Sequence, residues 1–350
     1  MTERSSFVGP GLWCLAAAML FGVTAPIAKP LVDRAGPVLL SGLLYAGAAL
    51  AVAPFALFDW RRHGRVPRQT LQRLFGAAFF GGIVGPVLLL AGLAMAPAST
   101  VSLWLTLETV ATAVLARLFF GEHLGATGVL ATLLVVGASV GLTGAAPHDT
   151  RAAVLVGLAC VAWGLDNNLT ALIDGVSTAE ITAFKGVVAG AVNVPIGLWL
   201  GGELAGTGLA VALGIGAIGY GASLVLYVAG AQQLGATRSQ LVFSTAPLFG
   251  LAAAFVLLGE PLGGRHAAAV LAMGAAIWLL QRESHGHAHR HGALEHTHWH
   301  RHDDDHHDHA HADGSVPSGW HQHSHRHEPL SHSHPHRPDL HHRHTHDAAD

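Results

Sequence analysis

The pentapeptide Gly121-Glu122-His123-Leu124-Gly125 recurs as Gly259-Glu260-Pro261-Leu262-Gly263, 138 positions further along the chain. Both copies lie in apolar stretches long enough to cross a bilayer. We therefore interpret the chain as an internal duplication of hydrophobic helices, as in membrane proteins built from structural repeats. The same offset relates six further pairs: Gly92 and Gly230, Ala98 and Ala236, Leu103 and Leu241, Ala131 and Ala269, Leu133 and Leu271, and Ala138 and Ala276.

The composition indicates a membrane protein with a separate polar tail. The chain is 51% hydrophobic and only 12% charged, whereas soluble domains carry roughly 25% charged residues. Residues 1–282 are mostly apolar, and residues 283–350 are polar and hold 23 of the 27 histidines. The formal net charge of -3 gives no electrostatic footprint for nucleic acid. Cys14 and Cys160 lie inside apolar segments without metal-site spacing, so we interpret them as core residues.

Ten stretches have the roughly 20 apolar residues that a spanning helix needs. Five spans per copy is an odd number, so the second copy enters the bilayer from the opposite side. The sequence therefore predicts an all-α integral membrane protein with a 5+5 inverted repeat. The predicted domains are residues 1–146, residues 147–282 and a disordered tail at 283–350. The ten predicted spans are 11–32, 37–58, 74–95, 98–119, 124–144, 152–173, 179–200, 207–230, 237–258 and 264–281.

Basic residues in short connections predict the orientation of the chain. If the N-terminus is cytoplasmic, nine arginines fall in the inside connections and three in the outside connections. This bias predicts that both termini, and with them the histidine-rich tail, are cytoplasmic.

Charged residues inside apolar spans are costly and are functional candidates by default. Glu108 lies about ten residues into the fourth span, or ~15 Å deep at helical rise, which places it near the midplane. Such a carboxyl group suits coupling to a proton, because desolvation favours its neutral form. The alternative is a permanently neutral acid that only forms a hydrogen bond between helices.

Asp166 and Lys185 are predicted to form a pair, because both lie ~10 Å from the same boundary on consecutive spans. Two roles remain open for them, contact with a solute and a static salt bridge between helices. Trp163, Asn167 and Thr170 share the helix face of Asp166, a combination that suits a small polar organic solute. The predicted substrate pathway comprises Glu108, Trp163, Asp166, Asn167, Lys185 and Asn193.

Four further residues receive mainly structural interpretations. Lys29 lies near the outer end of its span, where a long side chain reaches the interface. Glu122 and Glu260 each precede a helix, which suits a capping role at its N-terminus. Trp104, one turn from Glu108, either lines the same cavity or packs against neighbouring helices or lipid.

These features resemble the EamA branch of the drug/metabolite transporter superfamily over roughly residues 10–282. The resemblance is carried by the duplicated unit with its GExLG ends, by Leu107-Glu108, and by the segment from Trp163 to Thr170 with Lys185, Gly186, Gly190 and Asn193. It implies a carrier of the bacterial inner membrane that exports, or sometimes imports, small solutes without ATP hydrolysis. It also implies a central cavity between the two halves. The superfamily transports many kinds of solute, so the resemblance does not identify the solute.

The tail from His285 to His346 is dominated by the pattern H-x-H. Imidazole binds Zn²⁺, Ni²⁺, Co²⁺ and Cu²⁺, so the tail is predicted to bind a divalent transition metal. Three roles remain open: delivering metal to the carrier, sensing metal, and incidental affinity. The predicted ligands act collectively and include His285, His287, His289, His291, His296, His298, His300 and His302.

The sequence thus favours a secondary-active carrier that exports a small polar metabolite by alternating access. The carrier is expected to need no cofactor. Its expected partners are the lipid bilayer, the solute and a coupling proton, and the formation of a homodimer is left open. One alternative is a divalent-metal carrier served by the tail. Another, of a different class, is a membrane-anchored metal buffer or sensor without transport. An enzyme is not expected, since no phosphate loop, nucleophile elbow or HExxH motif is present.

Overall fold

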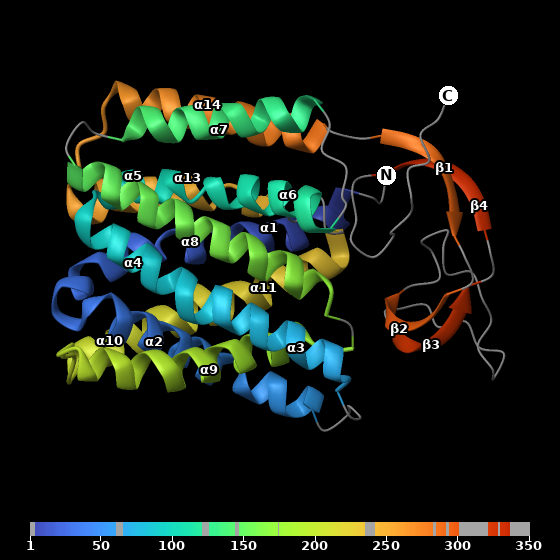
Figure 1. The fold of residues 1–350 in the computed structure, drawn as a ribbon, viewed down its shortest axis with the longest axis horizontal. Coiled ribbons are helices and arrows are strands. Elements are labelled where there is room, and N and C mark those ends of the chain that lie inside the picture. Colours follow the sequence, from blue (N-terminus) through green and yellow to red (C-terminus); the bar gives the residue numbers. More distant parts are fainter. Residues whose placement is uncertain are drawn as a thin grey trace.

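The computed structural model describes residues 4–60, 66–120, 126–143, 147–173, 175–234, 242–282, 285–291, 294–300, 321–327 and 330–336. The first copy of the GExLG pentapeptide, at 121–125, therefore lies outside the described residues. Through residue 282 the described chain is helical (Figure 1). This is the expected outcome for apolar segments in lipid, where a helix satisfies its own backbone hydrogen bonds.

The first part of the chain forms α1 (Arg4–Gly22), α2 (Thr24–Trp60), α3 (Arg68–Ala77), the π-helix η1 (Ala78–Val84), α4 (Gly85–Met95), α5 (Ala98–Trp104), α6 (Leu107–Phe120) and α7 (Ala126–Leu142). The second part forms α8 (Pro147–Ala171), α9 (Thr178–Trp199), α10 (Thr207–Ile215), the π-helix η2 (Gly216–Ala222), α11 (Ser223–Leu234), α13 (Ala246–Leu258) and α14 (Gly264–Arg282).

Six helical stretches of the described chain are long and apolar enough to cross a membrane, and three shorter apolar helices accompany them. The longest stretch, Gly9–Asp59, covers 51 residues. Gly36 interrupts it with φ 71° and ψ 157°, a backbone conformation that favours glycine. This break lies between the first two predicted spans. The chain is thus a multi-pass membrane protein, as predicted.

The bundle exposes large apolar side chains on its outside, and small residues lie where its helices approach each other most closely. Leu118, Phe119, Val256 and Leu271 are between 68% and 75% exposed, as suits a surface that faces acyl chains. Inside, an added Cβ on Gly216 would stand 1.9 Å from Leu44 O, because η2 packs directly on the backbone of α2. Close packing through small residues is typical of membrane helices.

The helix contacts follow a paired pattern. Helix α4 packs against α8, and α11 packs against α1. Likewise η1 packs against α9, and η2 packs against α2. Two further pairs, α2 with α9 and α7 with α14, complete the pattern, and α7 and α14 lie side by side along one edge of the bundle (Figure 1).

The two π-helices occupy matching positions in the two halves of the chain. Each has seven residues, and η2 begins and ends 138 positions after η1, which is the offset of the repeated pentapeptide. Isolated π-helical turns inside α-helices occur frequently at functional sites.

In the tail, where the sequence predicts disorder, the structure describes four strands: β1 (His285–His291), β2 (Leu294–His300), β3 (His321–His327) and β4 (Leu330–His336). Strand β1 pairs antiparallel with β4, and β2 with β3. The predicted disorder rested on the scarcity of apolar residues. The H-x-H alternation, however, has the two-residue period of a strand, which accounts for the difference. Of the predicted metal ligands, His302 lies outside the described residues.

Candidate functional site

Two helices are interrupted at matching points, one in each half of the chain. Between α5 and α6, the amides of Thr106 and Thr109 donate to the carbonyls of Leu103 and Thr106, three residues back. Before and within α13, Thr245 N donates to Val242 O at 3.2 Å and Leu248 N donates to Thr245 O at 2.9 Å. Both pairs of bonds are related by 139 positions. The spanning helices of the two halves therefore change pitch at equivalent places.

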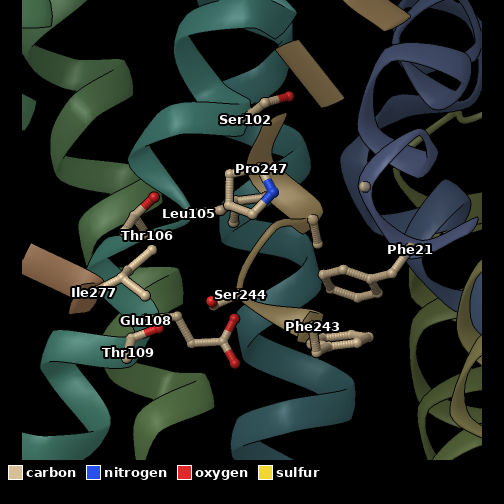
Figure 2. Close-up of a pocket in the computed structure, with 12 residues that line it drawn as sticks. Phe21, Ser102, Leu105, Thr106, Glu108, Thr109, Phe243, Ser244, Pro247 and Ile277 are labelled. Carbon is tan, nitrogen blue, oxygen red and sulfur yellow. The ribbon is translucent and has the colours of Figure 1, made fainter. Parts of the chain in front are cut away.

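A pocket lies between these two breaks (Figure 2). Its volume is about 60 Å³, which accommodates a few water molecules. Polar groups of α6 line one side, and aromatic and apolar groups of α1, α13 and α14 line much of the rest. The lining residues are Phe21, Gly22, Ser102, Leu105, Thr106, Glu108, Thr109, Phe243, Ser244, Ala246, Pro247 and Ile277.

Glu108 is the acidic residue of this pocket, in the first turn of α6. Its carboxylate points towards the side on which Phe21 and Phe243 lie (Figure 2). Asn167 Nδ2 on α8 donates to Glu108 Oε1 at 3.0 Å and to Thr112 Oγ1 at 3.2 Å. The Thr112 hydroxyl in turn donates to the Glu108 carbonyl at 2.9 Å. Asn167 thus holds the carboxylate through Oε1, and Thr112 holds the amide group of Asn167 in place.

Asp166 and Lys185 form the predicted pair, with Lys185 Nζ 2.5 Å from Asp166 Oδ1. Their side chains are 8% and 15% exposed. Thr170 Oγ1 donates to Asp166 Oδ1 at 3.0 Å and accepts from Lys185 Nζ at 3.2 Å. A charge pair in such surroundings is tolerated because each group is both paired and hydrogen-bonded.

The two remaining predicted pathway residues, Trp163 and Asn193, donate hydrogen bonds to backbone carbonyls of η1. Gly81 O accepts from Trp163 Nε1 at 3.0 Å and from Tyr45 OH at 2.5 Å. Asn193 Nδ2 donates to Ile83 O at 3.2 Å and to Ser41 Oγ at 3.0 Å. Side chains from α2, α8 and α9 therefore hold the π-helical turn in place.

A row of aromatic rings connects the η1 cluster with the pocket. Tyr45 contacts Tyr220 with ring centroids 5.5 Å apart, and Tyr220 contacts Phe21 at 5.7 Å. Phe21 contacts Phe243 at 5.5 Å, and Phe243 contacts Tyr227 at 4.9 Å. These separations are typical of favourable aromatic pairs. The row takes residues from α1, α2, η2 and α11 and from position 243, so it crosses both halves of the chain.

Away from this site, two charged residues hold the turn between α4 and α5. Lys29 Nζ donates to Leu93 O at 2.7 Å and to Ala96 O at 2.6 Å, at the C-terminal end of α4. The Glu260 carboxylate accepts from Ala98 N and Ser99 N, both at 2.8 Å, at the start of α5. Each charge has the sign that the helix dipole favours.

These contacts bear on two of the sequence interpretations. Lys29 binds backbone carbonyls at the end of α4, where the helix presents unpaired acceptors. Glu260 is a cap as predicted, but it caps α5 and not the helix that follows it in sequence. The matching interpretation of Glu122 lies outside the described residues.

The predicted pathway residues divide into two clusters. Glu108 and Asn167 lie at the pocket, whereas Trp163, Asp166, Lys185 and Asn193 surround η1. The side chain of Asn167 therefore contacts α6, while that of its neighbour Asp166 contacts α9. Two roles were left open for Trp104, and the structure supports packing between helices over lining the cavity. This residue is 1% exposed, and its Nε1 donates to Ser139 O at 3.0 Å.

Sequence reasoning missed the tyrosines and Phe243. All three tyrosines of the chain, Tyr45, Tyr220 and Tyr227, lie inside predicted apolar spans. A tyrosine hydroxyl in lipid needs a partner, and this was an available signal. Phe243 carried no comparable signal, since its importance depends on which helices meet.

Among the residues whose side chains the structure describes, no group of three or more His, Cys, Asp or Glu is arranged to hold a metal ion.

The chain belongs to the EamA-like transporter family, which matches residues 10–144 and again residues 150–282. An uncharacterized transporter of Methanothermobacter thermautotrophicus is 27% identical over 269 residues, covering 71% of this chain and 78% of that protein. An uncharacterized protein of Pseudomonas aeruginosa is 32% identical over 186 residues, covering 52% of this chain and 64% of that protein. The family identifies the chain as a membrane transporter.

A solved crystal structure of another protein has a related fold, with a TM-score of 0.55 at 20% sequence identity. The match covers 79% of this chain and 98% of that protein. At this level of identity the likeness concerns the fold alone.

Proposed function

We propose that this transporter is a secondary-active carrier that moves a small polar metabolite by alternating access, with its binding site between the two broken helices. The observation that carries the proposal is the pair of equivalent breaks beside one pocket. Carriers with inverted repeats bind their solutes near the midplane, between discontinuous helices. In this pocket Glu108, fixed by Asn167, is the acidic group in the lining.

The proposal includes ten spanning helices in a 5+5 inverted repeat. Three observations support it: the twofold family match, the equal spacing of η1 and η2, and the paired helix contacts. The break at Gly36 supports two spans within Gly9–Asp59. A reporter fused before Gly11 and one fused after Gln281 should both face the cytoplasm, and opposite locations would contradict this topology.

Alternating access requires the two halves to separate on one side at a time. A pocket of about 60 Å³ is too small for most metabolites, so solute entry needs a movement of the helices that line it. Both halves line the pocket, because α1, α5 and α6 belong to the first half and α13 belongs to the second. If the halves rock against each other, the pocket opens to one side of the membrane and then to the other. The family resemblance favours export from the cytoplasm of a bacterial cell across its inner membrane.

In this proposal Glu108 binds and releases the coupling proton. The two charged groups that act on it electrostatically, Asp166 of α8 and Lys185 of α9, are paired with each other. Purified protein in proteoliposomes should show saturable solute flux that depends on an imposed pH gradient. Glu108→Gln should abolish that dependence, while Glu203→Gln, at an exposed loop position, should retain it. Unchanged pH dependence in Glu108→Gln would remove this role.

The histidine-rich tail is proposed to bind a divalent transition metal. Its H-x-H spacing is the basis of this proposal. Flux measured with and without residues 283–350, at controlled zinc, nickel and cobalt concentrations, distinguishes the roles. A divalent-metal carrier would move the ion itself, whereas a buffer or sensor without transport would bind metal in the absence of any flux.

A further inference from the structure

We infer that the pocket at the helix breaks selects organic cations, that is, solutes with a substituted ammonium group. This inference rests on the proposed carrier function and names the class of solute. It is carried by the charge balance of the site and by the aromatic rings opposite Glu108.

Among the described residues Glu108 is a carboxyl group without a cationic partner, and a cationic solute would favour its ionised form. Asp166 and Lys185 cancel each other at 2.5 Å. Among the described residues no lysine, arginine or histidine forms an ion pair with Glu108, whose partner is the neutral amide of Asn167. A desolvated carboxylate is stable when it is paired with a cation. An anionic solute would be repelled by the same group.

The rings opposite the carboxylate fit an ammonium group better than a bare metal ion. Phe21 and Phe243 both line the pocket, and their planes meet at 41° with centroids 5.5 Å apart. Both rings line the pocket that contains Glu108, and a cation over a ring face is attracted by the ring's quadrupole. The lining contains no histidine or cysteine among the described residues, whereas transition metals favour those ligands.

The carboxylate lies on the wall of the pocket opposite the two rings. Asn167 donates to its Oε1 from the α8 side. Figure 2 shows the carboxylate directed towards the side of the two rings. Once the lining helices have moved apart to admit a solute, a cation between the two walls would contact the carboxylate on one side and the rings on the other.

The test compares three ammonium ions with neutral molecules of the same shape. Purified full-length protein in lipid nanodiscs is titrated with tetramethylammonium, choline and benzyltrimethylammonium, and with neutral counterparts such as 3,3-dimethylbutan-1-ol for choline. Binding is followed by calorimetry. We expect at least one ammonium ion to bind tenfold or more tightly than its neutral counterpart. The inference is overturned if none of the three does so.

Two variants test the residues. Glu108→Gln should remove the preference for the cation over its neutral counterpart. Phe243→Leu should weaken cation binding about fivefold, equivalent to ~1 kcal/mol, with little effect on the neutral molecule. Phe255→Leu, on the exposed face of α13, is the matched control and should bind like the parent. A cation preference that survives Glu108→Gln contradicts the inference.

Transport in proteoliposomes separates this inference from the carrier proposal. If the protein moves neutral or anionic solutes through a pathway blocked by Glu108→Gln, but no ammonium ion, the carrier remains and the cation selectivity is wrong. If it moves no solute of any charge, both proposals are wrong.

Discussion

Gly81 of η1 lies directly against the carboxylate of Asp166. A Cβ placed on Gly81 would stand 1.9 Å from Asp166 Oδ2 and 2.9 Å from Asp166 Cβ. The position tolerates no side chain while the Asp166–Lys185 pair keeps its place. A Cβ placed on Gly219, the corresponding glycine of the second half, would stand 2.2 Å from Thr24 Oγ1. The side chain next to the glycine is therefore a carboxylate in one case and a hydroxyl in the other.

Gly81→Ala should displace Asp166 and break its bond to Lys185. We expect a large loss of transport and a lower thermal unfolding temperature, because neither the backbone of η1 nor the paired carboxylate yields easily. Gly157→Ala in α8 is the matched control, since no atom lies within 4 Å of its added Cβ. The control should be neutral or slightly stabilising through helix propensity. Equal effects of the two substitutions would contradict this reading of Gly81.

Asp166 and Lys185 should show strong coupling in a double-mutant cycle. Asp166→Asn and Lys185→Met each leave one charge unpaired in a surrounding with little solvent, at a cost of ~3–5 kcal/mol. The double variant leaves no unpaired charge and should be more stable than either single variant. Reversible unfolding in detergent measures the three free energies. Additive losses would mean that the two charges do not interact.

Tyr45 and Trp163 share one acceptor, so their removal should be more than additive. Tyr45→Phe or Trp163→Phe leaves Gly81 O with one donor, and each is expected to cost ~0.5–1.5 kcal/mol. The double variant leaves the carbonyl with neither side-chain donor. Its free energy of unfolding should fall by more than the sum of the single losses. A smaller combined loss would show that a solvent molecule or another group replaces the donors.

Glu260→Ala should destabilise the junction of α4 and α5. It removes an acceptor that binds two backbone amides and the Ser99 hydroxyl, and the loss of such a cap costs ~1–2 kcal/mol. Hydrogen exchange at the amides of Ala98 and Ser99 should accelerate. Glu203→Ala, at an exposed loop position, is the control. Unaltered exchange at Ala98 and Ser99 in Glu260→Ala would argue against the cap.

Much of the fold follows from hydropathy and from the internal repeat. The spans are apolar because lipid accepts little else, and helices result because no water is present to satisfy the backbone. Glu108, Asp166 and Lys185 were recognisable as candidates for the same reason, since a charge stands out in an apolar segment. The Asp166–Lys185 pair was also predictable, because equal depth on consecutive helices brings the two side chains together.

The tertiary structure decided which groups meet across the bundle. Glu260 caps a helix some 160 positions earlier in the chain, and no local pattern indicates this partner. The two π-helical turns and the two helix breaks arise where helices of both halves press together, so hydropathy alone does not reveal them.

The sequence by itself determined a duplicated membrane transporter with costly charges in its spans, among them Glu108, Asp166 and Lys185, because transfer into lipid acts on each residue separately. Only the tertiary structure decided that one of these charges remains without a cationic partner in the described chain, beside the rings of Phe21 and Phe243. That arrangement depends on short-range contacts among α1, α6, α8 and position 243, and such contacts exist only once the helices are packed.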